Sequence, residues 1–380
     1  MSQAQSVLLA LNIGSTGLKA ASFSFPEAAL GRRDAPSEIE RIAIATEHHD
    51  AGALDEVAEQ QLAGAVARLP SLRTAPIVVA HRIVHGGDHA GPAELTPEVL
   101  EELRGLSALA PLHQPPALAL ARAASQRWPR ARQVAVFDTS WHQAMPEIHR
   151  VLPVPYSLYL RGVKRYGFHG LAFQSAMRQL AALAPDLARG RVVLAHLGGG
   201  SSLSAVRDGR CVNTTMGMTP LDGIPMSTRP GALDPGVLLH LQRALGMPAR
   251  DIDQLLWHEC GMKGLSGESG DMRQLLGSGS DGAHRAIAVY VSAVAQGVAA
   301  MAASVAGIDC LVFSGGVGAH AAEIRARVAG ELDWLGVGID PRANAVNARE
   351  ISAADVRART FALAVDEELE IALAAAALAG

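Results

Sequence analysis

The fold is decided by residues 6–25, SVLLALNIGSTGLKAASFSF, where an apolar run is interrupted by a glycine-hydroxyl turn and then resumes. The pattern predicts a strand over residues 6–13 and a second strand over residues 18–25. Residues 191–206, RVVLAHLGGGSSLSAV, repeat the pattern, and a turn at Asp208-Gly209 leads into a further strand over residues 210–215. Because the same strand–turn–strand pattern begins both halves of the chain, the sequence predicts a duplicated fold with a cleft between the copies.

Other apolar runs alternate with helical patterns along the chain. Strands are expected at residues 75–80, 133–137 and 310–313, and helices at residues 55–68, 96–106, 116–126 and 321–331. This alternation indicates an α/β protein, and the repeat places a domain boundary near residue 140.

Composition limits the class of protein. Of the 380 residues, 49% are hydrophobic, which is enough for two domains with buried cores. A net charge of −4 argues against a nucleic-acid or anionic-membrane partner. The three cysteines are far apart and fit a reducing compartment, and residues 1–11 lack a signal-peptide pattern. We therefore expect a soluble, cytoplasmic protein in which the uncharged stretch 286–308 is a buried core helix and not a membrane span.

Three glycine turns at strand ends are candidates for phosphate binding. Glycine lets backbone N–H groups approach an anion closely, and neighbouring hydroxyl groups add donors. The turns occupy residues 14–17, 198–202 and 314–318, and the first lacks the spacing of a Walker A loop. One such turn alone is more typical of a hairpin or a strand–helix connection, whereas three at strand ends favour phosphate binding.

Two charged residues stand near strand ends. Arg82, in the run HRIVHGGD, could bind a carboxylate or phosphate through its planar guanidinium, although a surface arginine between structural histidines explains it equally well. Asp138 directly follows the strand that ends at Phe137, where α/β folds bind ligands. Its neighbours Ser140 and His142 are too close in sequence to form a hydrolase triad with it.

Further polar candidates lie in glycine-rich or proline-rich loops. His113 precedes two prolines, and a structural histidine is the commoner outcome there. His169 stands beside an aromatic residue between glycines, and Arg229 lies in the polar loop 214–234. The acids at 366–368 precede an alanine-rich helix, so they either complement its dipole or bind a magnesium ion.

Taken in order, these runs resemble the acetate kinase family. Each motif is weak by itself, but the collinear set from residue 12 to residue 368 is specific. The matching runs are NIGS (12–15), HRIVHGG (81–87), APLH (110–113), VFDT (136–139), RYGFHG (165–170), HLG (196–198), MGMTPL (216–221), STR (227–229), DMR (271–273), FSGGVG (313–318) and EEL (367–369).

The resemblance implies a fold and an activity. The expected fold is a duplicated ribonuclease H-like, actin-like ATPase fold with an interdomain cleft. Residues 1–139, joined by a C-terminal helix at 369–380, would form the first domain, and residues 140–368 would bind nucleotide and form a homodimer. The implied activity is reversible transfer of the ATP γ-phosphoryl group to acetate, directly and in line, with ATP or ADP and Mg²⁺ (or Mn²⁺) required.

The resemblance also implies residue roles. Arg82 and Arg229 would clamp the carboxylate and the phosphoryl group, His169 would donate a hydrogen bond to the phosphoryl oxygens, and Asp138 would orient the reacting groups or help to hold the metal. Asn12 and Glu367 would position Mg²⁺. The implied nucleotide contacts are Asn12, Ser15, Lys19, His113, His196, Gly198, Gly200, Asp271, Met272, Arg273, Gly315, Gly316 and Gly318. The implied acid pocket has Arg82 and the apolar residues Val84, Leu112, Phe168 and Pro220, and it favours acetate over propionate by only ~1–3 kcal/mol.

The sequence departs from the family pattern on the nucleotide side. The family's asparagine in the second glycine turn is Gly199, a serine of the first turn is Gly17, and the Glu-Asn pair after the third turn is Ala319-His320. Phe173 replaces a histidine. Three interpretations stay open: an ATP-using acetate kinase, a kinase for another donor such as pyrophosphate or another acid such as propionate or butyrate, and a weakened ligand-binding regulatory protein.

Overall fold

The chain forms two compact α/β units in the computed structural model, which describes residues 5–14, 17–26, 36–45 and 54–379. The first unit comprises Met1–Gln143, His169–Leu171 and Asp366–Gly380, and the second comprises Ala144–Phe168 and Ala172–Val365. The division after Gln143 lies close to the boundary near residue 140 that the repeat predicts.

The first unit is built on a six-stranded mixed sheet with the order β3-β2-β1-β4-β6-β5. Its strands are β1 (Gln5–Gly14), β2 (Gly17–Pro26), β3 (Ser37–Ala45), β4 (Val78–Ile83), β5 (Ala93–Glu94) and β6 (Arg132–Phe137). Strands β1, β4 and β6 are parallel neighbours, so their carboxyl ends share one edge of the sheet. Strands β1, β2 and β3 are joined in antiparallel order.

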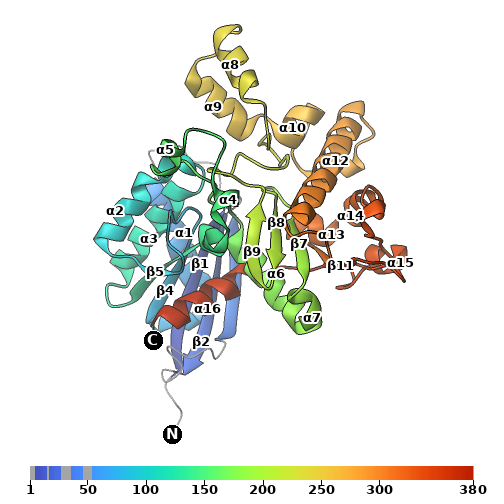
Figure 1. The fold of residues 1–380 in the computed structure, drawn as a ribbon. Coiled ribbons are helices and arrows are strands. Elements are labelled where there is room, and N and C mark those ends of the chain that lie inside the picture. The colour runs from blue at the N-terminus through green and yellow to red at the C-terminus, as the bar shows by residue number, and fades with distance from the viewer. Residues whose placement is uncertain (1–4, 15–16, 27–35, 46–53, 380) are drawn as a thin grey trace. The chain divides into compact units, whose positions relative to one another are not determined.

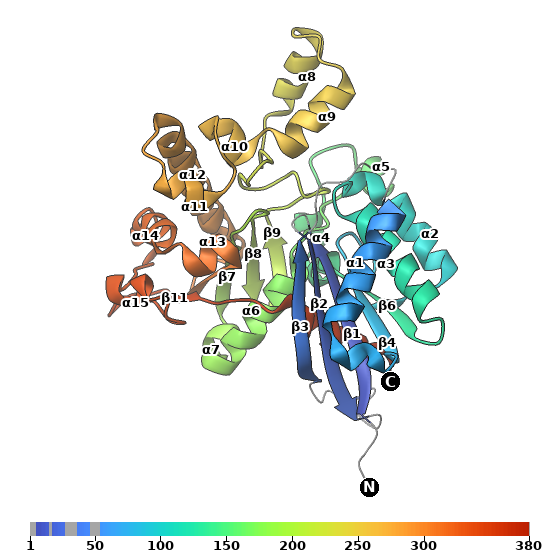
Figure 2. The ribbon, with the colours of Figure 1, turned by 180° about the vertical axis from the view of Figure 1, so that it is seen from behind.

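Strand β1 is apolar at nearly every position because it is buried on both faces. Leu9 and Leu11 face the core formed with α1 (Leu54–Arg68) and α3 (Gln114–Arg127). Leu8 and Ala10 face the C-terminal helix α16 (Glu367–Ala379). Figure 1 shows α16 lying across the sheet, and Figure 2 shows α1 and α3 on the opposite face. The last helix of the chain therefore completes the core of the first unit.

The second unit repeats this connectivity in a five-stranded sheet with the order β11-β10-β7-β8-β9. The strands are β7 (Arg191–His196), β8 (Ser202–Arg207), β9 (Arg210–Thr214), β10 (Cys310–Ser314) and β11 (Arg359–Ala362). As in the first sheet, three strands in antiparallel order, here β7, β8 and β9, come first in the chain. They are followed by β10 and β11, which run parallel to β7. The duplication predicted from the sequence is therefore confirmed at the level of sheet topology.

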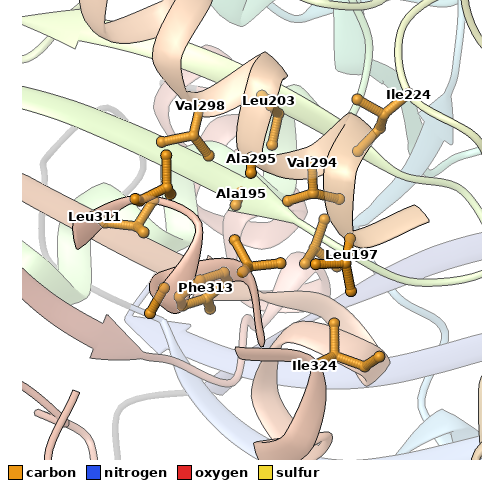
Figure 3. Close-up of a cluster of buried hydrophobic side chains, with 14 of the residues drawn as sticks. Ala195, Leu197, Leu203, Ile224, Val294, Ala295, Val298, Leu311, Phe313 and Ile324 are labelled. Atoms are coloured by element: carbon orange, nitrogen blue, oxygen red, sulfur yellow. The ribbon is translucent and has the colours of Figure 1, made fainter. Parts of the chain in front are cut away.

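Helix α12 (Asp281–Ser304) supplies much of the second unit's core. Figure 3 shows Val294, Ala295 and Val298 of this helix packed with residues of β7, β8 and β10. The prediction of a core helix is confirmed for this face. On the opposite face Val289 is 40% exposed. The helix begins at Asp281, earlier than the stretch 286–308 that the sequence indicated. By length and composition α12 could cross a membrane, and half of its most apolar window is buried within the protein.

The remaining elements connect these layers. In the first unit they are η3 (Pro70–Arg73), α2 (Pro97–Gly105), η4 (Ser107–Leu109) and η5 (Asp138–Ala144), whose last residue belongs to the second unit. In the second unit they are α4 (Glu147–Arg150), α5 (Tyr156–Tyr159), α7 (Pro185–Ala188), α8 (Pro235–Arg243), α9 (Ala249–His258), α10 (Gly261–Ser266), α11 (Met272–Gly277), α13 (Gly315–His320), α14 (Ala322–Gly330), η6 (Asp333–Leu335) and α15 (Pro341–Ala345). Helix α6 (Gly170–Leu183) begins in the first unit and continues in the second.

At two places the observed elements differ from those predicted from the sequence. The strand expected at 75–80 is β4, which starts only at Val78 because its register pairs Val78 with Leu8, and it therefore carries Arg82 within the strand. The third glycine turn is itself the short helix α13, which precedes the predicted helix α14.

Candidate active site

Three polar side chains of the first unit come from the carboxyl ends of neighbouring parallel strands. Asn12 lies near the end of β1, Arg82 near the end of β4, and Asp138 directly after β6. The parallel pairing of these strands brings their ends to one edge, where α/β sheets bind ligands. All three side chains are buried or nearly so: Asn12 is 3%, Asp138 0% and the Arg82 side chain 10% exposed.

Arg82 and Asp138 form a bidentate ion pair. Arg82 Nη2 lies 2.6 Å from Asp138 Oδ2, and Arg82 Nε lies 3.2 Å from both carboxylate oxygens. Burial alone would lower the pKa of Arg82, but the carboxylates of Asp138 and Glu367 raise it above its usual range. Burial raises the pKa of Asp138, and the guanidinium opposes that rise. The pair therefore holds a charged guanidinium in a fixed orientation in a dry environment.

Asn12 connects this pair to the first turn of α16. Arg82 Nη1 donates to Asn12 Oδ1 at 3.0 Å, and Asn12 Nδ2 donates to Glu367 Oε2 at 2.9 Å and to Glu368 Oε1 at 2.7 Å. Glu367 Oε2 also lies 3.6 Å from Arg82 Nη1. Asp366 accepts a hydrogen bond from the backbone N–H of Leu369, as expected of an acid that caps a helix.

The donor atoms around Glu367 suit a hard divalent cation. Asn12 offers an amide oxygen and Glu367 a carboxylate whose side chain is 13% exposed. Mg²⁺ is usually held by one or two such protein oxygens together with substrate phosphates, so these two residues fit that ion chemically. Among the residues that the structure describes, no group of three or more His, Cys, Asp or Glu side chains forms a metal cage.

His169 belongs to the first unit through the short segment His169–Leu171. Its backbone adopts a left-handed conformation with φ of 59°, which is uncommon for a residue other than glycine and is often found at functional sites. The next residue, Gly170, packs so closely on Asp138 that an added Cβ would lie 2.0 Å from the Asp138 carbonyl oxygen. The backbone N–H of Leu171 also donates to the Asp138 carboxylate. The sequence run YGFHG therefore attaches His169 to the Asp138 site.

Arg229 is a buried cation in the second unit. Its side chain is 8% exposed, and its Nη1 donates to the carbonyl oxygen of Pro220 at 2.9 Å. Burial lowers the pKa of Arg229 to about 10, and within the described ranges no carboxylate forms an ion pair with it. A guanidinium that is desolvated without a counter-charge is suited to bind an anionic ligand.

The second and third glycine turns lie side by side in the second unit. They follow β7 and β10, which are parallel neighbours. The carbonyl of Leu197 accepts from the N–H groups of Val317 and Gly318, and His196 Nδ1 lies 3.2 Å from Ser314 Oγ. Gly198, Gly200, Gly315, Gly316 and Gly318, all predicted nucleotide contacts, are thereby gathered at one end of this sheet.

The positions that depart from the family pattern have different surroundings. A Cβ on Gly199 would meet only Ser227 Oγ, at 3.7 Å, so the missing side chain leaves open space. Phe173 is fully buried, and its ring contacts the ring of His196 edge-on, with 6.4 Å between centroids. Ala319 is buried, whereas His320 is exposed.

The predicted nucleotide run Asp271–Arg273 starts helix α11. Asp271 caps the helix by accepting from the backbone N–H of Arg273, and the two side chains form an ion pair of 2.7 Å. These contacts with Arg273 lower the pKa of Asp271. The Arg273 side chain is 90% exposed, while Met272 is buried. Arg273 is therefore open to solvent beside the buried Met272.

The other predicted residues divide between the units. Val84 is buried and Leu112 half-buried in the first unit, whereas Phe168 and Pro220 are buried in the second. Lys19 is exposed on β2 directly opposite Asn12, and His113 is the half-buried residue preceding α3. Ser15 lies outside the described residues. The pocket predicted from Val84, Leu112, Phe168 and Pro220 stays a prediction.

Sequence reasoning missed three residues with extensive contacts to the predicted site. Arg41 and Glu368 form an ion pair of 2.8 Å, and Glu368 binds Asn12. Arg325 is fully buried and donates to the carbonyl oxygen of Gly318 in the third glycine turn. Glu368 was noted only as one acid of a run. Arg41 lies on β3, for which the sequence predicted no strand, and nothing in the local sequence of the predicted helix 321–331 marks Arg325 as buried.

Comparison with known proteins gives one consistent family. The model of the acetokinase family matches residues 8–373. An acetate kinase of Methylocella silvestris is 40% identical, with 96% of each chain covered, and one of Nitrobacter hamburgensis is 44% identical over 79% of this chain and 75% of its own. Among solved structures, a propionate kinase from Francisella tularensis has a TM-score of 0.84 at 31% sequence identity. The acetate kinase of Porphyromonas gingivalis has a TM-score of 0.79 at 30% sequence identity. Each match covers 97% of this chain and 98% of the other chain. These neighbours confirm the predicted duplicated actin-like α/β fold.

Proposed function

The chain belongs to the acetokinase family, and we propose that it is an acetate kinase, which reversibly transfers the γ-phosphoryl group of ATP to acetate to give acetyl phosphate and ADP. The observation that carries this proposal is the similarity to an acetate kinase over 96% of both chains. The ion pair of Arg82 and Asp138 and the unpaired cation of Arg229 support it, because phosphoryl transfer depends on positioning and on neutralising negative charge.

In this proposal each charged residue has a defined task. Arg82 binds the carboxylate or the transferring phosphoryl group, and Asp138 keeps its guanidinium oriented. Arg229 neutralises charge that develops on the phosphoryl oxygens, and His169 donates a hydrogen bond to them. Transfer is direct and in line. Arg82 and His169 belong to the first unit, and Arg229 belongs to the second.

Mg²⁺ is the proposed cation, with Asn12 and Glu367 as its protein ligands. The ion would neutralise charge on the nucleotide phosphates when bound. The amide and carboxylate oxygens of these residues supply hard donors, and Glu368 and Arg82 hold Asn12 in place by hydrogen bonds at 2.7 and 3.0 Å. The glycine turns at residues 198–202 and 314–318 are the proposed cradle for the nucleotide phosphates.

We also propose a cytoplasmic homodimer that associates through the second unit. Exposed apolar side chains on and after α8 support an interface there, since Leu239 is 45% and Leu245 63% exposed. A cytoplasmic location agrees with the use of ATP and with three cysteines that form no disulfide bond with one another, of which Cys211 and Cys310 are buried.

The test is a matrix of donors and acceptors. The purified, folded protein is incubated with ATP, GTP or pyrophosphate and with acetate, propionate or butyrate, and acyl phosphate is trapped with hydroxylamine. We expect the highest rate with ATP and acetate, and a measurable rate with propionate because one methylene is worth only ~1–3 kcal/mol in such a pocket. A preference for pyrophosphate or for a longer acid would replace the proposed substrate. If no combination yields hydroxamate, the protein is not an acyl kinase.

A further inference from the structure

Arg41 on β3 binds three carboxylates at once. Its Nη1 donates to Glu368 Oε2 at 2.8 Å and its Nη2 to Asp366 Oδ2 at 2.7 Å, while Nη2 also contacts Glu38 Oε2 at 2.5 Å. Asp366 directly precedes α16 and Glu368 lies in its first turn, so Arg41 attaches the start of this helix to β3, the outer strand of the antiparallel β1-β2-β3 segment. The planar guanidinium suits this role, because its several N–H groups can bridge separate carboxylates.

Glu368 connects Arg41 to the candidate site through hydrogen bonds. It is 3% exposed, and its two oxygens have different partners: Oε2 accepts from Arg41, and Oε1 accepts from Asn12 Nδ2 at 2.7 Å. Asn12 Oδ1 in turn accepts from Arg82 Nη1 at 3.0 Å. A continuous chain of hydrogen bonds therefore runs from Arg41 through Glu368 and Asn12 to Arg82.

The chain fixes the direction in which Asn12 points. Its amide nitrogen faces Glu367 and Glu368, and its amide oxygen consequently faces Arg82. Without Arg41, Glu368 would be a buried carboxylate lacking its nearest counter-charge, and its attraction for Arg82 would compete with that of Asp138. Arg41 thus balances the charge that would otherwise disturb the Arg82 pair.

We propose that Arg41 is a positioning residue that acts through Glu368 to hold Asn12, Glu367 and Arg82 in the arrangement that these hydrogen bonds define. The inference rests on the proposed function for its kinetic consequence, but the positioning itself is a statement about structure. Partners of metal-binding side chains commonly affect metal affinity or activity by about 10–100-fold, which sets the expected size of the effect.

The test compares Arg41→Ala with matched variants. We expect Arg41→Ala to lower kcat by about 10-fold or more and to raise the Mg²⁺ concentration for half-maximal rate by about 10-fold. Arg41→Lys should recover part of the loss, since an ammonium group can pair with one carboxylate but cannot bridge three. Glu38→Gln removes only the exposed partner, and Arg359→Ala breaks a similar pair with Glu350, 2.6 Å apart, in the second unit; both should stay within about twofold of wild type.

A crystal structure of Arg41→Ala gives a readout that does not depend on turnover. We expect the side chains of Asn12 and Glu367 to be rotated away from their wild-type positions. Unchanged side chains, or wild-type kcat and Mg²⁺ dependence with only a lower melting temperature, would overturn the proposal and leave Arg41 a structural residue. If the wild-type protein itself has no kinase activity, the proposed function fails, and the crystal structure alone decides whether Arg41 positions these groups.

Discussion

Arg82 and Arg229 are both buried cations, but they differ in what their removal leaves behind. Replacing Arg82 leaves Asp138, which is fully buried, without its counter-charge. Replacing Arg229 leaves only the carbonyl oxygen of Pro220 without a donor. We therefore expect Arg82→Ala to lower the free energy of unfolding by about 3–5 kcal/mol and Arg229→Ala to lower it far less, while both abolish most of the turnover.

The control for this pair is Arg82→Ala combined with Asp138→Asn, which removes the uncompensated carboxylate. Urea unfolding should show that the double variant regains part of the lost stability without regaining activity. Wild-type turnover in Arg82→Ala or Arg229→Ala would remove that residue from the mechanism. Because Arg82 is paired with the buried Asp138, we expect a fold of nearly wild-type stability only for Arg229→Ala.

His81 makes stability depend on pH. It is 1% exposed on β4, its Nε2 lies 2.8 Å from Gln133 Oε1, and burial lowers its pKa to about 4. The unfolded chain, with a histidine pKa of about 6.5, takes up a proton first as the pH falls. The contribution of neutral His81 to the free energy of unfolding is therefore fully retained above pH ~6.5 and decreases as the pH falls from ~6.5 to about 4. At pH 5 the loss is about 2 kcal/mol.

Unfolding curves at pH 7.5 and pH 5 test this expectation. His81→Gln cannot titrate in this range, so its loss of stability between the two pH values should be smaller than that of wild type by about 2 kcal/mol. Equal losses in the two proteins would show that His81 does not control this transition.

At the residue scale, sequence motifs identified the charged groups at strand ends but not the residues that hold them. Asn12, Arg82 and Asp138 could be predicted because parallel strands end at one edge. Arg41 could not, because its partners Asp366 and Glu368 lie more than 300 positions away in the chain, and only the folded sheet brings them together.

At the scale of elements, the third glycine turn allows a paired test. Gly315 has φ of 78°, and a Cβ there would lie 2.5 Å from the Leu197 carbonyl oxygen, whereas a Cβ on Gly316 would meet nothing within 4 Å. We expect Gly315→Ala to lose stability by roughly 1–3 kcal/mol. Gly316→Ala should be as stable as wild type or slightly more so, because alanine is a better helix former.

The two variants also test the phosphate cradle. If the turn binds the nucleotide, the methyl group of Gly316→Ala enters the space that a phosphate would occupy, and the KM for ATP should rise while the KM for acetate stays nearly constant. Thermal unfolding and steady-state kinetics together separate the two effects. An unchanged KM for ATP in a stable Gly316→Ala protein would exclude this turn from nucleotide binding.

Elements with strong local signals were predicted well. The apolar strands β1, β2, β7 and β8, each flanking a glycine turn, lie where the sequence placed them. The segment from α8 to α11 was missed, since its short helices are separated by glycine and proline residues and leave many side chains exposed. Strand β4 began later than expected because pairing with β1, and not local apolarity, sets its first residue.

At the scale of the whole molecule, the two sheets share one connectivity but have separate cores. Residues of α12 and β10 fill the second core, while the first is closed by α16 from the opposite end of the chain. The repeat of strand, glycine turn and strand was enough to predict the duplication. The route by which the C-terminal helix returns to the first unit leaves no local pattern and was expected only from the family resemblance.

The return of α16 gives a final prediction with a matched control on the same helix. Ala375 is fully buried against the first sheet, whereas Ala377 is exposed. Ala375→Asp would place an unpaired carboxylate among Leu8, Ala10 and Phe23, which we expect to cost about 3 kcal/mol or more. Ala377→Asp introduces the same side chain in water and should stay within about 0.5 kcal/mol of wild type.

Hydrogen exchange followed by mass spectrometry locates the damage. Ala375→Asp should lose amide protection in β1, β4 and β6, and protection in β7 and β10 should persist because those strands belong to a separate core. Activity should fall as well, since α16 carries Glu367. Equal loss of protection in both sheets would mean that the two units unfold as one cooperative body, and the separate cores would then not confer separate stability.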